Sequence, residues 1–284
     1  MATIDLPQGV VTYRATGPAD SPVPPVVFVH PVLIDASLWS GVADRLAAQG
    51  IRSFAPDWPL GSHREPLQAD ADVSPRGVAT LIISFLEALD LDDVTLVGND
   101  TGGALIQFVL DTDTSRVGRV VLANCDAFDT FPPFPFSTVF PMLKGRARMR
   151  FNLQPMRLRA FRHSPLGYGL LSSNLDPEQT KAWIAPCLAT PAIRRDTVRF
   201  LKAIDPKELL EVSTRLARFD GPVAIVWGAA DRAFKPELGR RLRHAFRDAR
   251  FVEVPGARTL LPLDAPDVLV AEIAKLSAPT PLAR

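Results

Sequence analysis

The chain has 284 residues, of which 47% are apolar, enough to bury one large α/β core with an inserted subdomain. Its 32 Lys and Arg nearly balance 31 Asp and Glu, and the net charge of +1 indicates neither a nucleic-acid binder nor an acidic-surface binder. Two cysteines provide no disulfide framework. No His, Cys or carboxylate cluster at ligand spacing predicts a metal, and no motif predicts an organic cofactor.

The N-terminal segment MATIDLPQGVVTYRATG has no basic region followed by an apolar run, so no signal peptide is predicted. No stretch of about eighteen uncharged apolar residues is available to span a membrane. We therefore expect a cytoplasmic protein with a small-molecule substrate and no nucleic-acid or membrane partner, either a monomer or a homodimer. The ending PTPLAR is expected to lack order.

Short β-rich runs alternate with amphipathic helical patterns along most of the chain. Fully apolar runs such as VVFV and VAIV, separated by helices, are typical of a parallel sheet covered on both faces. The first two runs have no helix between them and predict an antiparallel hairpin at the sheet edge. Strands are predicted at 4–6, 10–15, 26–30, 53–55, 95–97, 120–123, 223–227 and 251–254, and helices at 38–49, 75–89, 104–110, 236–246 and 266–276.

Between Asp126 and about Lys207 this alternation stops. We predict a helical lid at 127–207, inserted after the sixth strand, with 1–126 and 208–284 forming the core domain. The lid would cover the carboxyl edge of the sheet, where ligands bind in open α/β sheets. It opens with FDTFPPFPF, whose phenylalanines either line an apolar pocket or fix the lid to the core: Phe128, Phe131, Phe134 and Phe136.

Basic residues crowd together inside the predicted lid. A solvated helix face is the usual explanation for such a cluster, and a phosphate- or carboxylate-binding site is the alternative. The residues are Lys144, Arg146, Arg148, Arg150, Arg157, Arg159 and Arg162.

The sequence GNDTGG at 98–103 fits the G-x-nucleophile-x-G turn, with a strand before it and a helix after it. Gly98 and Gly102 avoid collisions with neighbouring backbone, and the strained turn would hold Asp100 out into a pocket. The N-terminus of the following helix favours an ionised carboxylate and any developing anion. A structural acid that only caps the helix is the alternative interpretation of Asp100.

With this turn, the chain resembles the α/β-hydrolase superfamily over nearly its full length. Because the residue at the turn is aspartate, the chain resembles in particular the branch of haloalkane dehalogenases and epoxide hydrolases. The further matching segments are VVFVHP (26–31), APDWP (55–59), VWGAAD (226–231) and PLDAP (262–266). The resemblance implies a mostly parallel eight-stranded sheet flanked by helices. It also implies two steps: the carboxylate forms an alkyl ester, and a histidine then activates water to hydrolyse it.

Several positions depart from the pattern of the haloalkane dehalogenases and epoxide hydrolases. Thr259 occupies the position of the catalytic histidine, although threonine has no group that titrates near neutral pH. Asp126 and Asp231 lie where two dehalogenase subgroups keep the acid of the triad. Val32 and Thr101 replace the Asn and Trp that hold a halide, but their backbone N–H groups can still form an oxyanion hole.

Four further residues are assigned to the substrate pocket: His30, Phe128, His163 and Tyr168. Of the histidines, His30, His63 and His163 are candidates to replace the missing base, and His244 is expected at the surface. Tyr168 is the one tyrosine of the predicted lid. The resemblance to epoxide hydrolases implies a role for it, because those enzymes use lid tyrosines to protonate the epoxide ring as it opens.

Three functions stay open at this point. The first is a hydrolase with Asp100 as nucleophile, which needs a substitute for the histidine such as His163 or a water held by Asp126 and Thr259. The second is a lyase, dehydratase or isomerase with Asp100 as general base, and the third is an inactive binding protein.

Arg258 is expected to form a salt bridge with Asp126 or Asp231.

Overall fold

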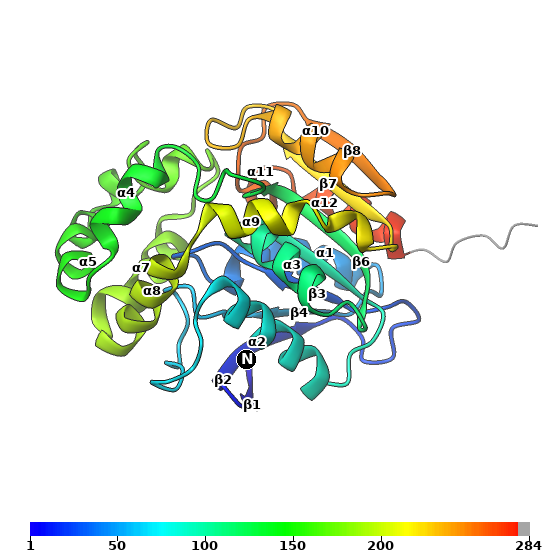
Figure 1. Ribbon diagram of the computed structural model, residues 1–284, viewed down its shortest axis with the longest axis horizontal. Helices are drawn as coiled ribbons and strands as arrows, with labels where there is room; N and C mark the ends of the chain where they lie inside the picture. Colours follow the sequence, from blue (N-terminus) through cyan, green and yellow to red (C-terminus); the bar gives the residue numbers. More distant parts are fainter. Residues whose placement is uncertain (278–284) are drawn as a thin grey trace, which may run out of the picture.

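The computed structural model describes residues 1–277, so the predicted unordered ending at 279–284 lies outside the described part. Eight strands form one sheet, as the sequence predicts, and Figure 1 shows helices packed around it. The strands are β1 (Ala2–Leu6), β2 (Gly9–Thr16), β3 (Val26–Val29), β4 (Ser53–Pro56), β5 (Val94–Asp100), β6 (Val117–Cys125), β7 (Val223–Gly228) and β8 (Ala249–Val254).

The sheet is mostly parallel, in the order β1-β2-β4-β3-β5-β6-β7-β8. β1 and β2 form an antiparallel hairpin at one edge, and β2 also pairs antiparallel with β4, whereas the other neighbours are parallel. The predicted parallel sheet and edge hairpin are therefore confirmed. β3 and β4 are buried at every position because helices cover both faces of the sheet.

The core helices form two groups. In the first, α1 packs against α12, and in the second α3 packs between α2 and α9. α2 begins as predicted, because Ser74 accepts a hydrogen bond from the N–H of Gly77 and Pro75 occupies the first turn. The helices are η1 (Ala36–Trp39), α1 (Ser40–Ala48), α2 (Pro75–Ala88), α3 (Thr101–Thr112), α9 (Pro206–Ser213), η4 (Leu216–Arg218), α10 (Pro236–Ala245), α11 (Leu261–Asp264) and α12 (Pro266–Ser277).

Two helices differ from the predictions by more than one residue at an end. The helix predicted at 38–49 is a 3₁₀ turn, η1, followed by α1. α3 begins at Thr101 rather than at 104, because the side chain of Asp100 accepts the N–H of Thr101 and so caps the helix directly. The strand therefore passes into the helix at Asp100 with no intervening loop.

Between β6 and α9 the chain forms a set of short helices, which we call the inserted helices. They are α4 (Phe136–Leu143), α5 (Arg146–Asn152), η2 (Gln154–Arg157), α6 (Arg159–Arg162), η3 (Tyr168–Leu170), α7 (Pro177–Ala189) and α8 (Pro191–Ala203). Figure 1 shows them gathered on one side of the molecule, with α4 and α5 furthest from the sheet. The sequence predicts a helical insertion at this point, whereas the domain boundaries at 127–207 and the action of these helices as a lid stay predictions.

Candidate active site

Asp100 lies at the end of β5 with backbone angles of φ 54° and ψ −126°, a left-handed conformation that is unfavourable for a residue with a side chain. The two nearby glycines allow the turn to close. A Cβ atom on Gly98 would lie 2.7 Å from the carbonyl oxygen of Gly102, and one on Gly102 would lie 2.1 Å from that of Val29. Only glycine fits at either position, and the strained turn directs the Asp100 carboxyl group away from the sheet.

The two oxygens of the Asp100 carboxyl group have different surroundings. Oδ1 accepts hydrogen bonds from the backbone N–H of Thr101, at 2.6 Å, and from its hydroxyl, at 3.2 Å. Oδ2 makes no hydrogen bond among residues 1–277. Burial raises the pKa of Asp100 to about 7, although the Thr101 hydrogen bonds oppose the increase, and the nearby charge of Asp231 adds to it.

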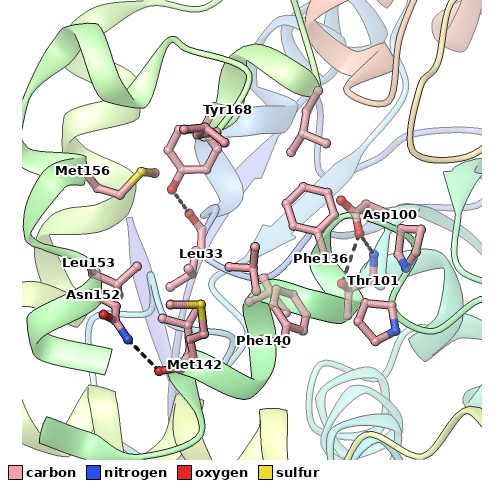
Figure 2. Close-up of a pocket in the computed structure, with 18 of the residues that line it drawn as sticks. Leu33, Asp100, Thr101, Phe136, Phe140, Met142, Asn152, Leu153, Met156 and Tyr168 are labelled. Atoms are coloured by element: carbon pink, nitrogen blue, oxygen red, sulfur yellow. Dashed lines mark hydrogen bonds between the residues drawn. The ribbon is translucent and has the colours of Figure 1, made fainter. Parts of the chain in front are cut away.

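A cavity of about 380 Å³ lies between the turn and the inserted helices. Figure 2 shows Asp100 and Thr101 at one side of it, with Phe136 close by. Two polar groups of the wall are already engaged: the Tyr168 hydroxyl donates to the carbonyl oxygen of Leu33, and Asn152 donates to that of Met142. The cavity is therefore an apolar chamber with one carboxyl group at its base. Its walls are Val32, Leu33, Asp100, Thr101, Pro132, Pro133, Phe136, Val139, Phe140, Met142, Leu143, Asn152, Leu153, Met156, Phe161, Leu166, Gly167, Tyr168 and Leu171.

Asp126, at the end of β6, is buried behind this wall and does not line the cavity. Neither of its carboxyl oxygens has a hydrogen-bond partner within residues 1–277. Burial raises its pKa well above the usual range, and the neighbouring charge of Asp100 raises it further. Burial and the neighbouring carboxylate therefore both disfavour the ionised form of Asp126.

Asp231 is also buried, but its carboxylate is well satisfied. It accepts hydrogen bonds from Asn124 Nδ2 at 2.6 Å and from the N–H groups of Ala233 and Phe234 at 2.7 and 3.0 Å. Burial raises the pKa of Asp231, and these hydrogen bonds oppose the increase. Asp231 thus organises the loop after β7 and contributes charge, but it does not line the cavity.

Thr259 is fully buried next to Asp231. Its carbonyl oxygen accepts a 2.7 Å hydrogen bond from Asn99 Nδ2, which also donates to the carbonyl of Ala123. The Thr259 hydroxyl makes no hydrogen bond within the described chain. Asn99 thereby joins β5, β6 and the loop that carries Thr259, and holds that loop against the turn.

Two of the predicted pocket histidines lie elsewhere, so that prediction was wrong. His30 Nε2 accepts the backbone N–H of Trp58 at 2.8 Å, and its Nδ1 is paired with the carbonyl oxygen of Pro31. Burial lowers the pKa of His30 to about 4, so the ring is neutral and links two core loops. His163 ends α6 and its Nε2 lies 3.0 Å from the hydroxyl of Thr180, which directs it toward α7.

The other two histidines are also outside the cavity wall. His63 is buried and its Nε2 lies 3.6 Å from Asp196 in α8. His244 is exposed, as predicted. Among residues 1–277, then, no histidine lines the cavity, and no group of His, Cys, Asp and Glu is placed to hold a metal ion.

The pocket assignment of Phe128 was also wrong. Phe128 has a left-handed φ of 56°, which turns its ring under the guanidinium of Arg241, 3.8 Å away. Of the other phenylalanines in FDTFPPFPF, only Phe136 lines the cavity.

The expected salt bridge of Arg258 is absent from the described structure, because its side chain donates instead to the carbonyl oxygen of Gly169 at 3.0 Å.

Most of the cavity wall was missed by sequence reasoning. One signal was available: Phe136, Phe140 and Leu143 recur at helical spacing and form the face of α4 that lines the cavity. Leu33, Met156 and Leu171 gave no comparable signal, because they come from separate turns that only tertiary packing brings together.

Comparisons with known proteins are consistent with this geometry. A sequence profile described as "Alpha/beta hydrolase family" matches residues 26–272. A 2-hydroxy-6-oxononadienedioate/2-hydroxy-6-oxononatrienedioate hydrolase of Dechloromonas aromatica is 29% identical over 78% of this chain and 75% of its own. A haloalkane dehalogenase of Mycobacterium bovis is 26% identical over 88% and 86%. The crystal structure of an alpha/beta hydrolase fold protein from Burkholderia ambifaria matches with a TM-score of 0.80 and 24% identity, covering 96% of this chain and 97% of that one.

Proposed function

Because the chain belongs to the alpha/beta hydrolase family, we propose that it is a hydrolytic enzyme with Asp100 as nucleophile toward a small apolar substrate. The observation that carries the proposal is the asymmetry of the Asp100 carboxylate. Oδ1 is held by two hydrogen bonds from Thr101, whereas Oδ2 is left without a partner in a residue that lines an apolar cavity. The relatives named above, a dehalogenase and a dioate hydrolase, support hydrolytic chemistry.

In the first step, Oδ2 attacks an electrophilic carbon of the substrate and forms an ester bond. With an alkyl halide, the carbon–halogen bond breaks and the halide leaves with the electron pair. With an epoxide, a ring carbon–oxygen bond breaks and the alkoxide takes up a proton. The phenol of Tyr168 lies in the cavity wall, but its proton is already donated to the carbonyl oxygen of Leu33, so we propose water as the source of this proton.

In the second step, water attacks the ester carbonyl carbon, whose oxygen is the former Oδ1. The N–H of Thr101 already points at this atom and would stabilise the negative charge that develops on it, with Val32 as the second donor. Collapse of the intermediate breaks the acyl–oxygen bond and releases the alcohol. This step needs a base, but Thr259 has no group that titrates near neutral pH, and burial disfavours the ionised form of Asp126. We therefore expect this second step to be the slow one, so that the ester accumulates before the alcohol is released.

Intact mass spectrometry after incubation with short alkyl halides and epoxides tests the proposal directly. The native protein should gain the mass of one alkyl group, and Asp100→Asn should gain none. Asp126→Asn serves as a matched control, because it removes a neighbouring buried carboxyl group but should leave adduct formation intact. An adduct of equal yield on Asp100→Asn would overturn the assignment of Asp100 as nucleophile. So would the absence of both adduct and alcohol from the native protein.

One observation favours a second candidate function. A pKa of about 7 suits a general base, because such a group is ionised often enough to accept a proton and basic enough to hold it. Asp100 would then abstract a proton in a lyase or isomerase reaction, with no ester and no need for a histidine. Turnover that requires Asp100 but leaves the mass of the protein unchanged would favour this function over the first.

A further inference from the structure

The inserted helices carry a surface with no acidic residue. From residue 130 to residue 175 the sequence has no Asp or Glu, although the whole chain is nearly neutral. Arg162 is buried and donates to carbonyl oxygens, but the other basic residues of this stretch form no ion pair among residues 1–277. They are Lys144, Arg146, Arg148, Arg150, Arg157 and Arg159.

Exposed apolar side chains gather in the same stretch. Phe151 is 77% exposed and Leu166 is 80% exposed. A single exposed apolar side chain is ordinary on a monomer surface, whereas several within one stretch are typical of an interaction site. Elsewhere in residues 1–277, only Met1 and Leu210 belong to this exposed apolar class. Its members within the stretch are Phe134, Val139, Met142, Phe151, Leu158 and Leu166.

The two kinds of side chain are interleaved on α5. Met149 is buried, so helical geometry directs Phe151 to the opposite, outer side of the helix, with Arg148 and Arg150 on the two flanks. A surface groove runs beside them and is lined by Phe151, Arg150 and other basic side chains from η2 and α8. Figure 1 shows α4 and α5 at the outer limit of the molecule, clear of the sheet.

This surface is continuous with the mouth of the cavity. Val139, Met142 and Leu166 line the cavity wall and are also among the exposed apolar side chains. We call the face formed by the exposed residues of 134–166 the basic-apolar face.

We propose that the basic-apolar face docks on an anionic lipid bilayer. The unpaired arginines would bind headgroup phosphates, and Phe151 with its apolar neighbours would enter the boundary between headgroups and acyl chains. Two copies of this face would repel one another, which disfavours a homodimer through it. The rest of the chain carries net negative charge, so an anionic surface would also orient the protein with this face toward the lipid.

Docking of this kind needs no membrane-spanning segment. No helix within residues 1–277 is long and apolar enough to cross a bilayer. The sequence predicts no membrane partner, because the chain has a net charge of only +1 and no spanning segment. A peripheral surface assembled from separate short helices gives neither signal.

Flotation with phosphatidylglycerol and phosphatidylcholine vesicles tests the charge of the face. The protein should bind the anionic vesicles and not the zwitterionic ones, and salt should weaken the binding. The triple variant Arg146→Gln, Arg150→Gln and Arg157→Gln should bind on the order of 100-fold more weakly, at roughly fivefold per arginine. The control triple removes the same number of positive charges from ion-paired surface positions and should bind like the native protein. It is Arg45→Gln, Arg240→Gln and Arg247→Gln.

Insertion is tested with Phe151→Trp and lipids brominated on their acyl chains. The four native tryptophans are fully buried, so vesicle quenching in the variant beyond that of the native protein reports the position of residue 151. We expect quenching of Phe151→Trp and none of the native protein. Absence of vesicle binding, equal loss in both triple variants, or binding without quenching would each overturn the proposal. Binding to a soluble polyanion such as RNA but not to vesicles would assign the face to another partner. Because the readout is binding, the result does not depend on the chemistry of Asp100.

Discussion

At the scale of single residues, two opposing influences determine the pKa of the Asp100 carboxyl group. Burial and the charge of Asp231 favour the protonated form, whereas the two hydrogen bonds from Thr101 favour the ionised form. Burial is the larger effect, which is why the pKa rises to about 7. The same shift lowers the stability of the fold as pH rises from about 4 to about 7, because the carboxyl group ionises in the unfolded chain first.

This balance predicts the pH dependence of the proposed alkylation. Since only the carboxylate is nucleophilic, the rate of adduct formation should rise with pH, with a midpoint near 7 rather than near 4. Thr101→Val removes the hydroxyl that stabilises the carboxylate, so its midpoint should move to higher pH. Rates from intact mass between pH 5 and 9 measure both midpoints. A native midpoint below 5, or no displacement in the variant, would contradict the assignment of Asp100 as a buried nucleophile.

At the scale of elements, the candidate site depends on the direct passage of β5 into α3. The backbone of Gly102 packs so closely on Val29 in β3 that a single methyl group has no space. The turn therefore ties the position of Asp100 to the neighbouring strand, and the stability of the turn comes from the sheet and not from its own backbone preference.

Gly102→Ala should consequently destabilise the protein by about 3 kcal/mol or more and abolish adduct formation, because either the turn or β3 must move. Gly41→Ala is the matched control: it lies in α1, where the added methyl group meets only the end of the Arg45 side chain, 3.3 Å away. It should leave stability unchanged or raise it by up to about 1 kcal/mol. Urea unfolding of both variants checks the contrast. A mild effect at Gly102 would mean that the turn is looser than the structure indicates.

At the scale of the whole molecule, the inserted helices are anchored to the core on one side. Asp196 in α8 accepts the backbone N–H of Leu67 at 3.0 Å and forms an ion pair with Arg195. In α7, the indole of Trp183 donates to the hydroxyl of Ser37 at 2.8 Å. α4 and α5 lie beyond this anchored side, where they line the cavity and carry part of the basic-apolar face.

Asp196→Ala should therefore cost about 3 kcal/mol of unfolding free energy, because it leaves a buried N–H and a guanidinium without their acceptor. The control Asp44→Ala removes an exposed ion pair with Arg14 and should cost no more than about 0.5 kcal/mol. Urea unfolding measures both values. Equal, small losses in the two variants would show that the inserted helices do not depend on this anchor.

Much of the molecule could be predicted from local pattern. Eight strands, the edge hairpin, the parallel sheet and the helical insertion follow from runs and periodicities within about twenty residues, which is the range over which backbone preference and amphipathic spacing act. The turn around Asp100 was predicted for the same reason, because its glycines and flanking strand and helix are contiguous in the sequence. Boundaries such as the start of α3 were less accurate, since they depend on one capping hydrogen bond.

What only the tertiary structure decided is which side chains meet at the cavity. His30, Phe128 and His163 were reasonable pocket residues by position, yet a hydrogen bond to Trp58, a left-handed turn and a contact with Thr180 take them elsewhere. The sequence by itself determined the strand-turn-helix unit that presents Asp100, because the strand, the glycines and the helix are contiguous in the chain. The apolar wall and the missing partners of Asp126 depend on contacts between separate segments of the chain, and the basic-apolar face depends on which side chains of residues 134–166 packing leaves exposed.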